Sequence, residues 1–135
     1  MNSAIPYHST DRQTPGTGEV FFDHVAWMVK DMDQASRVFE RLGFRLTPYS
    51  EHANRDPETG KRVAQGTANR LAMLESGYIE LLCSVDGVEA PVVHDLRARI
   101  GRYQGVHLLA FSDADADKAH RRISESGFRL QPMVH

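Results

Sequence analysis

The four-residue sequence GFRL occurs twice in this chain, at residues 43–46 and 127–130. The same signals precede both copies: a short apolar run, closely spaced aspartates, apolar residues at helical spacing, and the glycine that opens the repeat. In each half this order predicts a strand, an Asp-capped helix, a glycine stop and a second strand. Because two copies of one unit must pack together, the repeat limits the fold more than any single element does.

The first unit begins with a β-branched and aromatic run at residues 20–29, which predicts a buried strand. Alternation places four side chains on one face of that strand, namely Phe22, His24, Ala26 and Met28. A histidine in the middle of such a strand is unusual enough to be a candidate for function.

A helix is predicted next, capped by Asp31 or Asp33 and ended by Gly43. The first GFRL then predicts a strand that Pro48 ends. Residues 50–66 are polar and predict a loop or a ragged hairpin tip. Two further strands, 69–74 and 78–84, are separated by Ser76 and Gly77, which suit a tight hairpin. The first unit is therefore βαβββ.

Residues 90–103 predict a connector helix, and residue 105 opens the second unit. A strand at 106–111 places His107, Leu109 and Phe111 on one face. A helix capped by Asp113 or Asp115 and ended by Gly127 follows, and the second GFRL predicts one more strand. The expected fold is α+β, with paired βαβββ modules of which the second is truncated after β-α-β.

This organisation predicts a flexible leader at 1–18 and one domain at 19–135. Within that domain, module one covers 19–86, the connector helix 90–103 and the partial module two 105–135. The net charge of −2 gives no electrostatic reason to expect nucleic-acid binding. No apolar run is long enough to span a membrane, and Cys83 is the single cysteine, so the expected location is the cytoplasm.

Three polar side chains with metal-binding chemistry interrupt apolar strands: His24, Glu80 and His107. A buried glutamate is costly unless it is paired or bound to a metal. The two histidines lie at similar places in the repeat, 19 residues before Gly43 and 20 residues before Gly127. Two imidazoles and one carboxylate on a shared sheet face would suit a divalent transition ion. A core histidine and a solvent-facing glutamate are the structural alternatives.

Three segments carry a resemblance to a known family: DHVAWMVKDMDQASRVFERLGF at 23–44, GTANRLAMLESGYIELL at 66–82 and GVHLLAFSDADADKAHRRISESGF at 105–128. With them the chain resembles the glyoxalase-like branch of the vicinal oxygen chelate superfamily. The resemblance implies two βαβββ modules that pair into a cup holding a metal ion. It implies His24, Glu80 and His107 as metal ligands. The fourth ligand of the family has no counterpart here, so the chain is expected to be a fragment, or to be completed by a partner chain.

The resemblance also implies a chemistry. A divalent ion (nickel, zinc, cobalt, manganese or iron) would bind two neighbouring oxygens of a small substrate and stabilise an enolate. Glu80 would be the catalytic residue that carries the proton. The expected activity is that of a metal-dependent lyase or isomerase.

Two alternatives stay open on the same fold. One is a metal-free module that binds a ligand or drug, like the bleomycin-resistance proteins. The other is an iron(II) extradiol-type dioxygenase. In those enzymes the iron ligands lie within one module, whereas here they would be shared between two, which counts against this alternative.

Four more residues are candidates for substrate binding, namely Asn69, Arg70, Met28 and Phe111. Alternation puts Arg70 on the opposite face from Asn69, so at most one of the two points inward. The open strand edges of a half-covered sheet predict a homodimer.

Overall fold

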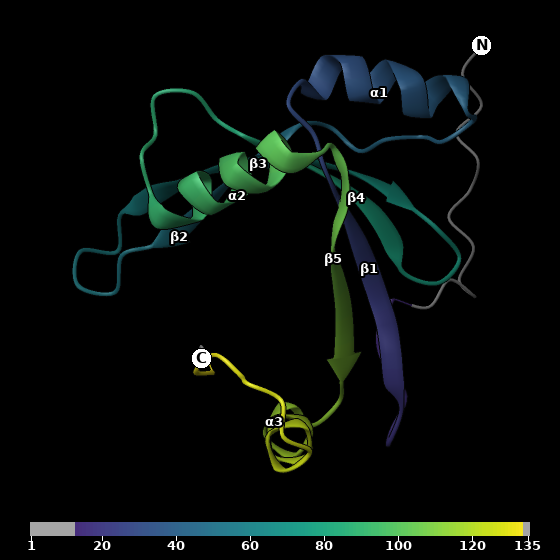
Figure 1. Cartoon of the computed structure of the whole chain (residues 1–135), viewed down its shortest axis with the longest axis vertical. Helices are drawn as coiled ribbons and strands as arrows, with labels where there is room; N and C mark the ends of the chain where they lie inside the picture. Colours follow the sequence, from purple (N-terminus) through teal and green to yellow (C-terminus); the bar gives the residue numbers. More distant parts are fainter. Residues whose placement is uncertain (1–12, 134–135) are drawn as a thin grey trace.

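The computed structural model describes residues 13–133, and within them the chain forms five strands and three helices (Figure 1). In chain order the elements are β1 (Val20–Met28), α1 (Met32–Arg41), β2 (Ser50–Arg55), β3 (Arg62–Met73), β4 (Tyr78–Ser84), α2 (Pro91–Arg102), β5 (Gly105–Asp113) and α3 (Ala116–Glu125). The α+β class and the βαβββ order of the first unit are confirmed.

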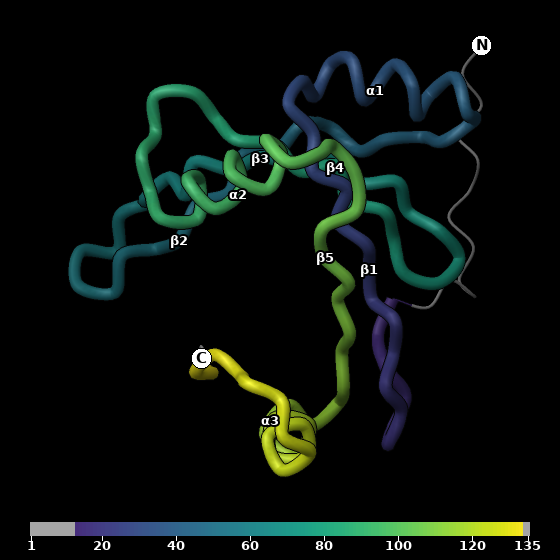
Figure 2. Tube along the Cα trace, in the orientation of Figure 1, coloured from purple at the N-terminus to yellow at the C-terminus, as the bar shows by residue number. Residues whose placement is uncertain are grey.

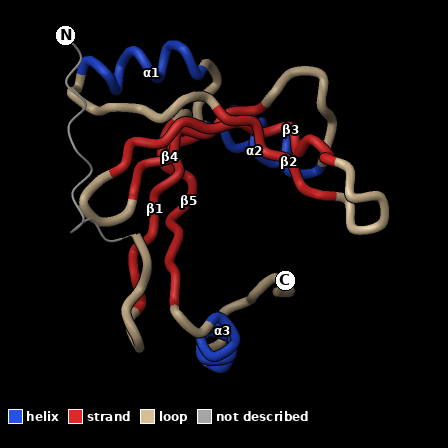
Figure 3. Tube along the Cα trace, turned by 180° about the vertical axis from the view of Figure 1, so that it is seen from behind, coloured by secondary structure: helices blue, strands red, loops and turns tan. Residues whose placement is uncertain are grey.

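All five strands belong to one sheet with the order β2-β3-β4-β1-β5. β1 runs parallel to β4 and antiparallel to β5, whereas β3 pairs antiparallel with both β2 and β4. The sheet is strongly curled, so that β1 and β5 run side by side away from β2 and β3 (Figures 2 and 3). The first strand of the chain therefore lies inside the sheet, between two strands that come much later.

The helices α1 and α3 begin and end where the repeat predicts. Asp31 caps α1 by accepting a hydrogen bond from the backbone N–H of Gln34, and Asp115 caps α3 by accepting one from Lys118. Each helix is followed by a glycine at positive φ, 97° at Gly43 and 86° at Gly127.

The predicted strands at the two GFRL copies do not form. Residues 44–49 have no regular structure: Phe44 and Leu46 both pack against the core, as one face of a strand would, but no neighbouring strand pairs with this segment. The second strand of the unit is β2, which lies in the segment predicted to be a loop. In the second unit, residues 128–133 are also irregular, and Phe128 is 68% exposed.

The core lies between α1 and one face of the sheet. Its buried side chains are Val29, Met32, Phe39, Ala68, Leu81 and Cys83. Met32 and Phe39 come from the apolar stripe of α1, and the sheet contributes alternate residues of β3 and β4. The other face of these strands, opposite α1, carries the polar residues Asn69 and Glu80 among apolar ones.

The second unit has no comparable core among the described residues. α3 buries none of its side chains, and its apolar residue Ile123 stays 38% exposed. On β5, the side chains of Leu109 and Phe111 are also exposed. Both units therefore have the capped helix of the repeat, but only the first unit packs its helix against a core.

Part of the predicted leader contacts the domain. Residues 1–12 lie outside the described residues, but the side-chain amide of Gln13 donates to the carbonyl oxygen of Leu74 at 2.9 Å. That carbonyl belongs to the predicted hairpin between β3 and β4, where the N–H of Leu74 donates to the oxygen of Gly77. None of the helices in 13–133 has the length and apolarity that a membrane crossing requires.

Candidate functional site

Three polar side chains meet on the sheet face opposite α1, which we call the His24 face. It is defined by His24 and Ala26 of β1, Glu80 of β4 and Asn69 of β3. The strand register brings them together, because Ala26 pairs with Glu80 and Asn69 pairs with Leu82. Residues separated by two along a strand share a face, so all four belong to one side of the sheet.

A chain of polar contacts connects these side chains. The Nδ1 atom of His24 lies 2.6 Å from Oδ1 of Asp23, and Nε2 of His24 lies 3.8 Å from Oε2 of Glu80. The side-chain amide of Asn69 donates to Oε1 of Glu80 at 2.7 Å. The Glu80 side chain is only 13% exposed, so its carboxyl is held by a partner as a buried acid requires.

Tyr78 completes the cluster. Its ring stacks on the His24 imidazole with the centroids 4.5 Å apart. Burial, followed by the nearby carboxylates of Asp23 and Glu80, raises the pKa of Tyr78 to about 12. The phenol is therefore a neutral hydrogen-bond donor at any ordinary pH.

His107 lies apart from this cluster. Its Nε2 atom is 2.9 Å from the carbonyl oxygen of Tyr103, and its ring stacks on the Tyr103 ring at 4.0 Å. Among residues 13–133, no three His, Cys, Asp or Glu side chains lie close enough together to hold a metal ion. The structure thus brings together two of the three predicted ligands, and a three-ligand metal centre does not fit this arrangement.

The four predicted substrate-binding residues have separate environments. Asn69 lies in the cluster, whereas Arg70 lies on the α1 side, where its Nε donates to the carbonyl oxygen of Thr47 at 2.8 Å. Met28 is buried, with 5% of its surface exposed. The expectation that at most one of Asn69 and Arg70 points inward agrees with these contacts.

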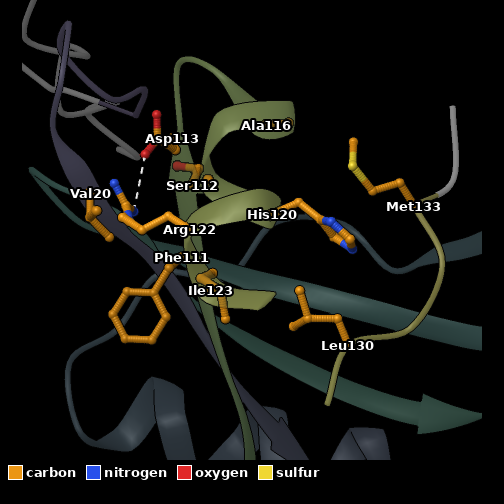
Figure 4. A pocket seen from close by; sticks show the side chains of 11 residues that line it. Val20, Phe111, Ser112, Asp113, Ala116, His120, Arg122, Ile123, Leu130 and Met133 are labelled. Atoms are coloured by element: carbon orange, nitrogen blue, oxygen red, sulfur yellow. Dashed lines mark hydrogen bonds and ion pairs between the residues drawn. The ribbon is translucent and has the colours of Figure 1, made fainter. Parts of the chain in front are cut away.

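Phe111 lines a different cavity, of about 410 Å³, between β5, α3 and the segment that follows α3 (Figure 4). Ile123 and Leu130 contribute apolar side chains to it, and Arg122 lies 3.5 Å from Asp113 at its edge. Phe111 also makes an edge-to-face contact with Phe22. Phe22 pairs with Phe111 and His24 with Ala110, so a register shift at Asp23 interrupts the predicted alternation of β1.

Two members of the cluster were not singled out from the sequence. Tyr78 could have been, because it alternates onto the same face as Glu80. Asp23 could not, because it lies at a register shift of β1 against β5, which leaves no local signal in the sequence.

The sequence profile of a family described as the glyoxalase-like domain matches residues 22–135. No curated protein sequence matches the chain significantly. The profile covers every element of the structure from β1 to α3 except the first two residues of β1.

Solved structures show the same fold. Methylmalonyl-CoA epimerase from Mycobacterium tuberculosis is 26% identical, with a TM-score of 0.57, over 90% of this chain and 73% of that chain. A single-residue variant of the Streptomyces coelicolor epimerase, in complex with 2-nitronate-propionyl-CoA, is 23% identical, with a TM-score of 0.52, over 82% of this chain and 75% of that chain. A hypothetical protein from Bacillus halodurans is 18% identical, with a TM-score of 0.57, over 80% and 69%.

Proposed function

The chain belongs to the family of glyoxalase-like domains, and from this premise we propose that it is an isomerase or lyase that moves a proton on a small, oxygen-rich substrate. The observation that carries the proposal is the approach of His24 and Glu80, whose Nε2 and Oε2 atoms lie 3.8 Å apart on the sheet face opposite α1. The epimerases of similar fold support a proton transfer at a carbon beside a carbonyl group, because their structures include complexes with 2-nitronate-propionyl-CoA and with methylmalonyl-CoA.

Glu80 is the proposed base. Asn69 holds one carboxylate oxygen by donating to Oε1, which leaves Oε2 turned toward His24. A carboxylate fixed in this way can take a proton from a substrate carbon placed next to Oε2. A fixed base needs little reorganisation when the proton moves.

His24 is the proposed partner on the substrate oxygen. A carboxylate cannot donate, so the 2.6 Å contact with Asp23 requires the proton of the neutral imidazole to sit on Nδ1. Nε2 then faces the site as an acceptor when the ring is neutral and as a donor when it is protonated. Tyr78, whose ring stacks on the imidazole of His24, keeps this imidazole in place.

The metal centre predicted from His24, Glu80 and His107 remains a prediction. A divalent ion would supply Lewis-acid stabilisation of an enolate. Because His107 is engaged by Tyr103, the proposed proton transfer rests on His24 and Glu80 themselves.

The test is hydrogen exchange in D2O, followed by proton NMR at the carbon beside the carbonyl group. Substrates are a 2-methyl-malonyl thioester and the hemithioacetal of an oxoaldehyde, each with and without added nickel, cobalt, zinc, manganese or iron(II). We expect exchange by the wild type and a loss of about 100-fold or more in Glu80→Gln. Glu75→Gln, the same change in the exposed turn between β3 and β4, is the matched control. No exchange with any substrate, or equal rates in wild type and Glu80→Gln, would contradict the proposal.

A metal-free binding module is the second candidate. It is favoured by the lack of a three-ligand cluster among residues 13–133. Saturable shifts of the His24 and Tyr78 NMR signals with a ligand, in the absence of any exchange, would support it. The dioxygenase alternative needs all three predicted ligands close together, and no observation on residues 13–133 favours it.

We also propose that the chain forms a homodimer. Within the described part of the chain, β5 ends the sheet, and it carries the exposed side chains of Val106, Leu109 and Phe111. An apolar outer strand of this kind favours association. Sedimentation velocity checks the proposal, and a monomer at all concentrations would count against it.

A further inference from the structure

The repeat can be aligned residue by residue through its helices. Gly43 and Gly127 lie 84 positions apart, and so do the capping residues Asp31 and Asp115. These four residues have equivalent structural roles in the two units, because each aspartate caps the start of a helix and each glycine follows the end of one. Applied to the preceding strands, the same offset makes Leu108 the counterpart of His24.

The strand register gives the same answer independently. Ala26 pairs with Glu80 on one side and with Leu108 on the other, so these three residues form a row across β4, β1 and β5. His24 lies two residues before Ala26 and pairs with Ala110. Leu108 therefore lies on the His24 face, with the small side chain of Ala26 between it and Glu80.

His107 lies outside that row. The register shifts between Ala26, which pairs with Leu108, and Trp27, which pairs with Val106, so His107 has no partner on β1. Its side chain instead contacts Tyr103 through Nε2 and through the stacked rings. The hydroxyl of Tyr103 donates to the carbonyl oxygen of Val106, which closes the corner between α2 and β5.

We propose that Leu108 occupies the place of the third polar ligand in this chain and that His107 holds the corner between α2 and β5. The His24 face then offers a ligand two hydrogen-bonding groups, His24 and Glu80, beside the apolar surface of Leu108, which is 40% exposed. Such a site takes a compound with an oxygen atom next to a small alkyl group, and it does not retain a transition metal. The inference rests on the proposed location of the site, but not on its reaction.

The test is titration of the full chain with cobalt(II), followed by the visible absorption of the bound ion and by competition with a chelator. Leu108→His places a third ligand on the row, and we expect it to bind one cobalt ion at least about 100-fold more tightly than the wild type. Loss of an outer-shell partner alone already costs a metal site roughly 10- to 100-fold. Adding His24→Ala to Leu108→His should abolish this gain. His107→Ala should leave cobalt binding as in the wild type and lower the thermal unfolding midpoint.

Two results would overturn the proposal. One is tight binding of one cobalt ion by the wild type that His107→Ala removes. The other is a folded Leu108→His variant, judged by circular dichroism, that binds cobalt no better than the wild type. If Leu108→His does not fold, Leu108→Asp supplies a smaller ligand at the same place. If neither variant folds, the comparison of cobalt binding by the wild type and by His107→Ala tests the proposal by itself. The titration contains no substrate, so its outcome is independent of the exchange assay for proton transfer.

Discussion

Gly77, in the turn between β3 and β4, is the position where one added methyl group should disturb both the fold and the candidate site. A Cβ atom built on Gly77 would lie 2.5 Å from the carbonyl oxygen of Asp23 and 3.1 Å from that of Phe22. Both contacts are with the backbone of β1, which cannot rotate away as a side chain can. The strand would have to move at the residue that precedes His24.

The cost of Gly77→Ala has two parts. The φ of Gly77 is 72°, a conformation that costs an L-residue about 1–2 kcal/mol. Relief of the contact with β1 resembles overpacking of a core, which typically adds about 1–3 kcal/mol. We therefore expect Gly77→Ala to lower the free energy of unfolding by about 2–5 kcal/mol. Gly60 in the turn between β2 and β3 has a φ of 67° but nothing within 4 Å of its Cβ position, so Gly60→Ala should cost only the first part.

Urea unfolding of the wild type and the two variants measures this difference. With a slope of about 2 kcal/mol per molar urea, Gly77→Ala should shift the midpoint by roughly 1–2.5 M and Gly60→Ala by roughly 0.5–1 M. The His24 signals in NMR spectra should move in Gly77→Ala and stay in Gly60→Ala. Equal midpoints for the two variants would refute the close approach of the turn to β1.

Two further predictions concern packing and pH. Phe44 and Phe128 hold the same place in the repeat, but Phe44 contacts Phe39 with the ring centroids 5.5 Å apart, while Phe128 is 68% exposed. Phe44→Ala should therefore lower the free energy of unfolding by about 2 kcal/mol and Phe128→Ala by less than about 0.5 kcal/mol, and similar losses in urea unfolding would contradict this. The raised pKa of Tyr78 predicts that stability falls as the pH rises from 10 to about 12, because the unfolded state loses this proton first. Tyr78→Phe should make that fall shallower, which thermal unfolding across this pH range would detect.

The helices were predictable because their signals are local. Asp31, Asp115, Gly43 and Gly127 act within one helical turn of their own positions. The GFRL segments misled the prediction for the same reason, because alternation says nothing about whether a neighbouring strand is available. Phe44 and Leu46 pack into the core, and no strand lies beside residues 128–130 within the described part of the chain.

The candidate site was predictable in part. Alternation alone separated Asn69 from Arg70. The two register shifts of β1 against β5 could not be foreseen, because a shift depends on two strands that are distant in sequence. Asp23, which contacts His24, lies at one of these shifts, and His107, which has no partner on β1, lies at the other.

The position of β1 inside the sheet also has a consequence for how the chain folds. β1 is made first, but its neighbours are β4 and β5, so its residue His24 must find Tyr78 on one side and Ala110 on the other. Pairings between such distant residues form slowly, because the entropy of closing a long loop is lost before the stabilising contacts can form. Until β4 and β5 have been synthesised, the β1 sequence VFFDHVAWM, which has a single acidic residue, has no strand to pair with. An apolar strand in that condition is prone to aggregate, so the yield of folded protein should depend on how quickly β4 and β5 arrive to cover it.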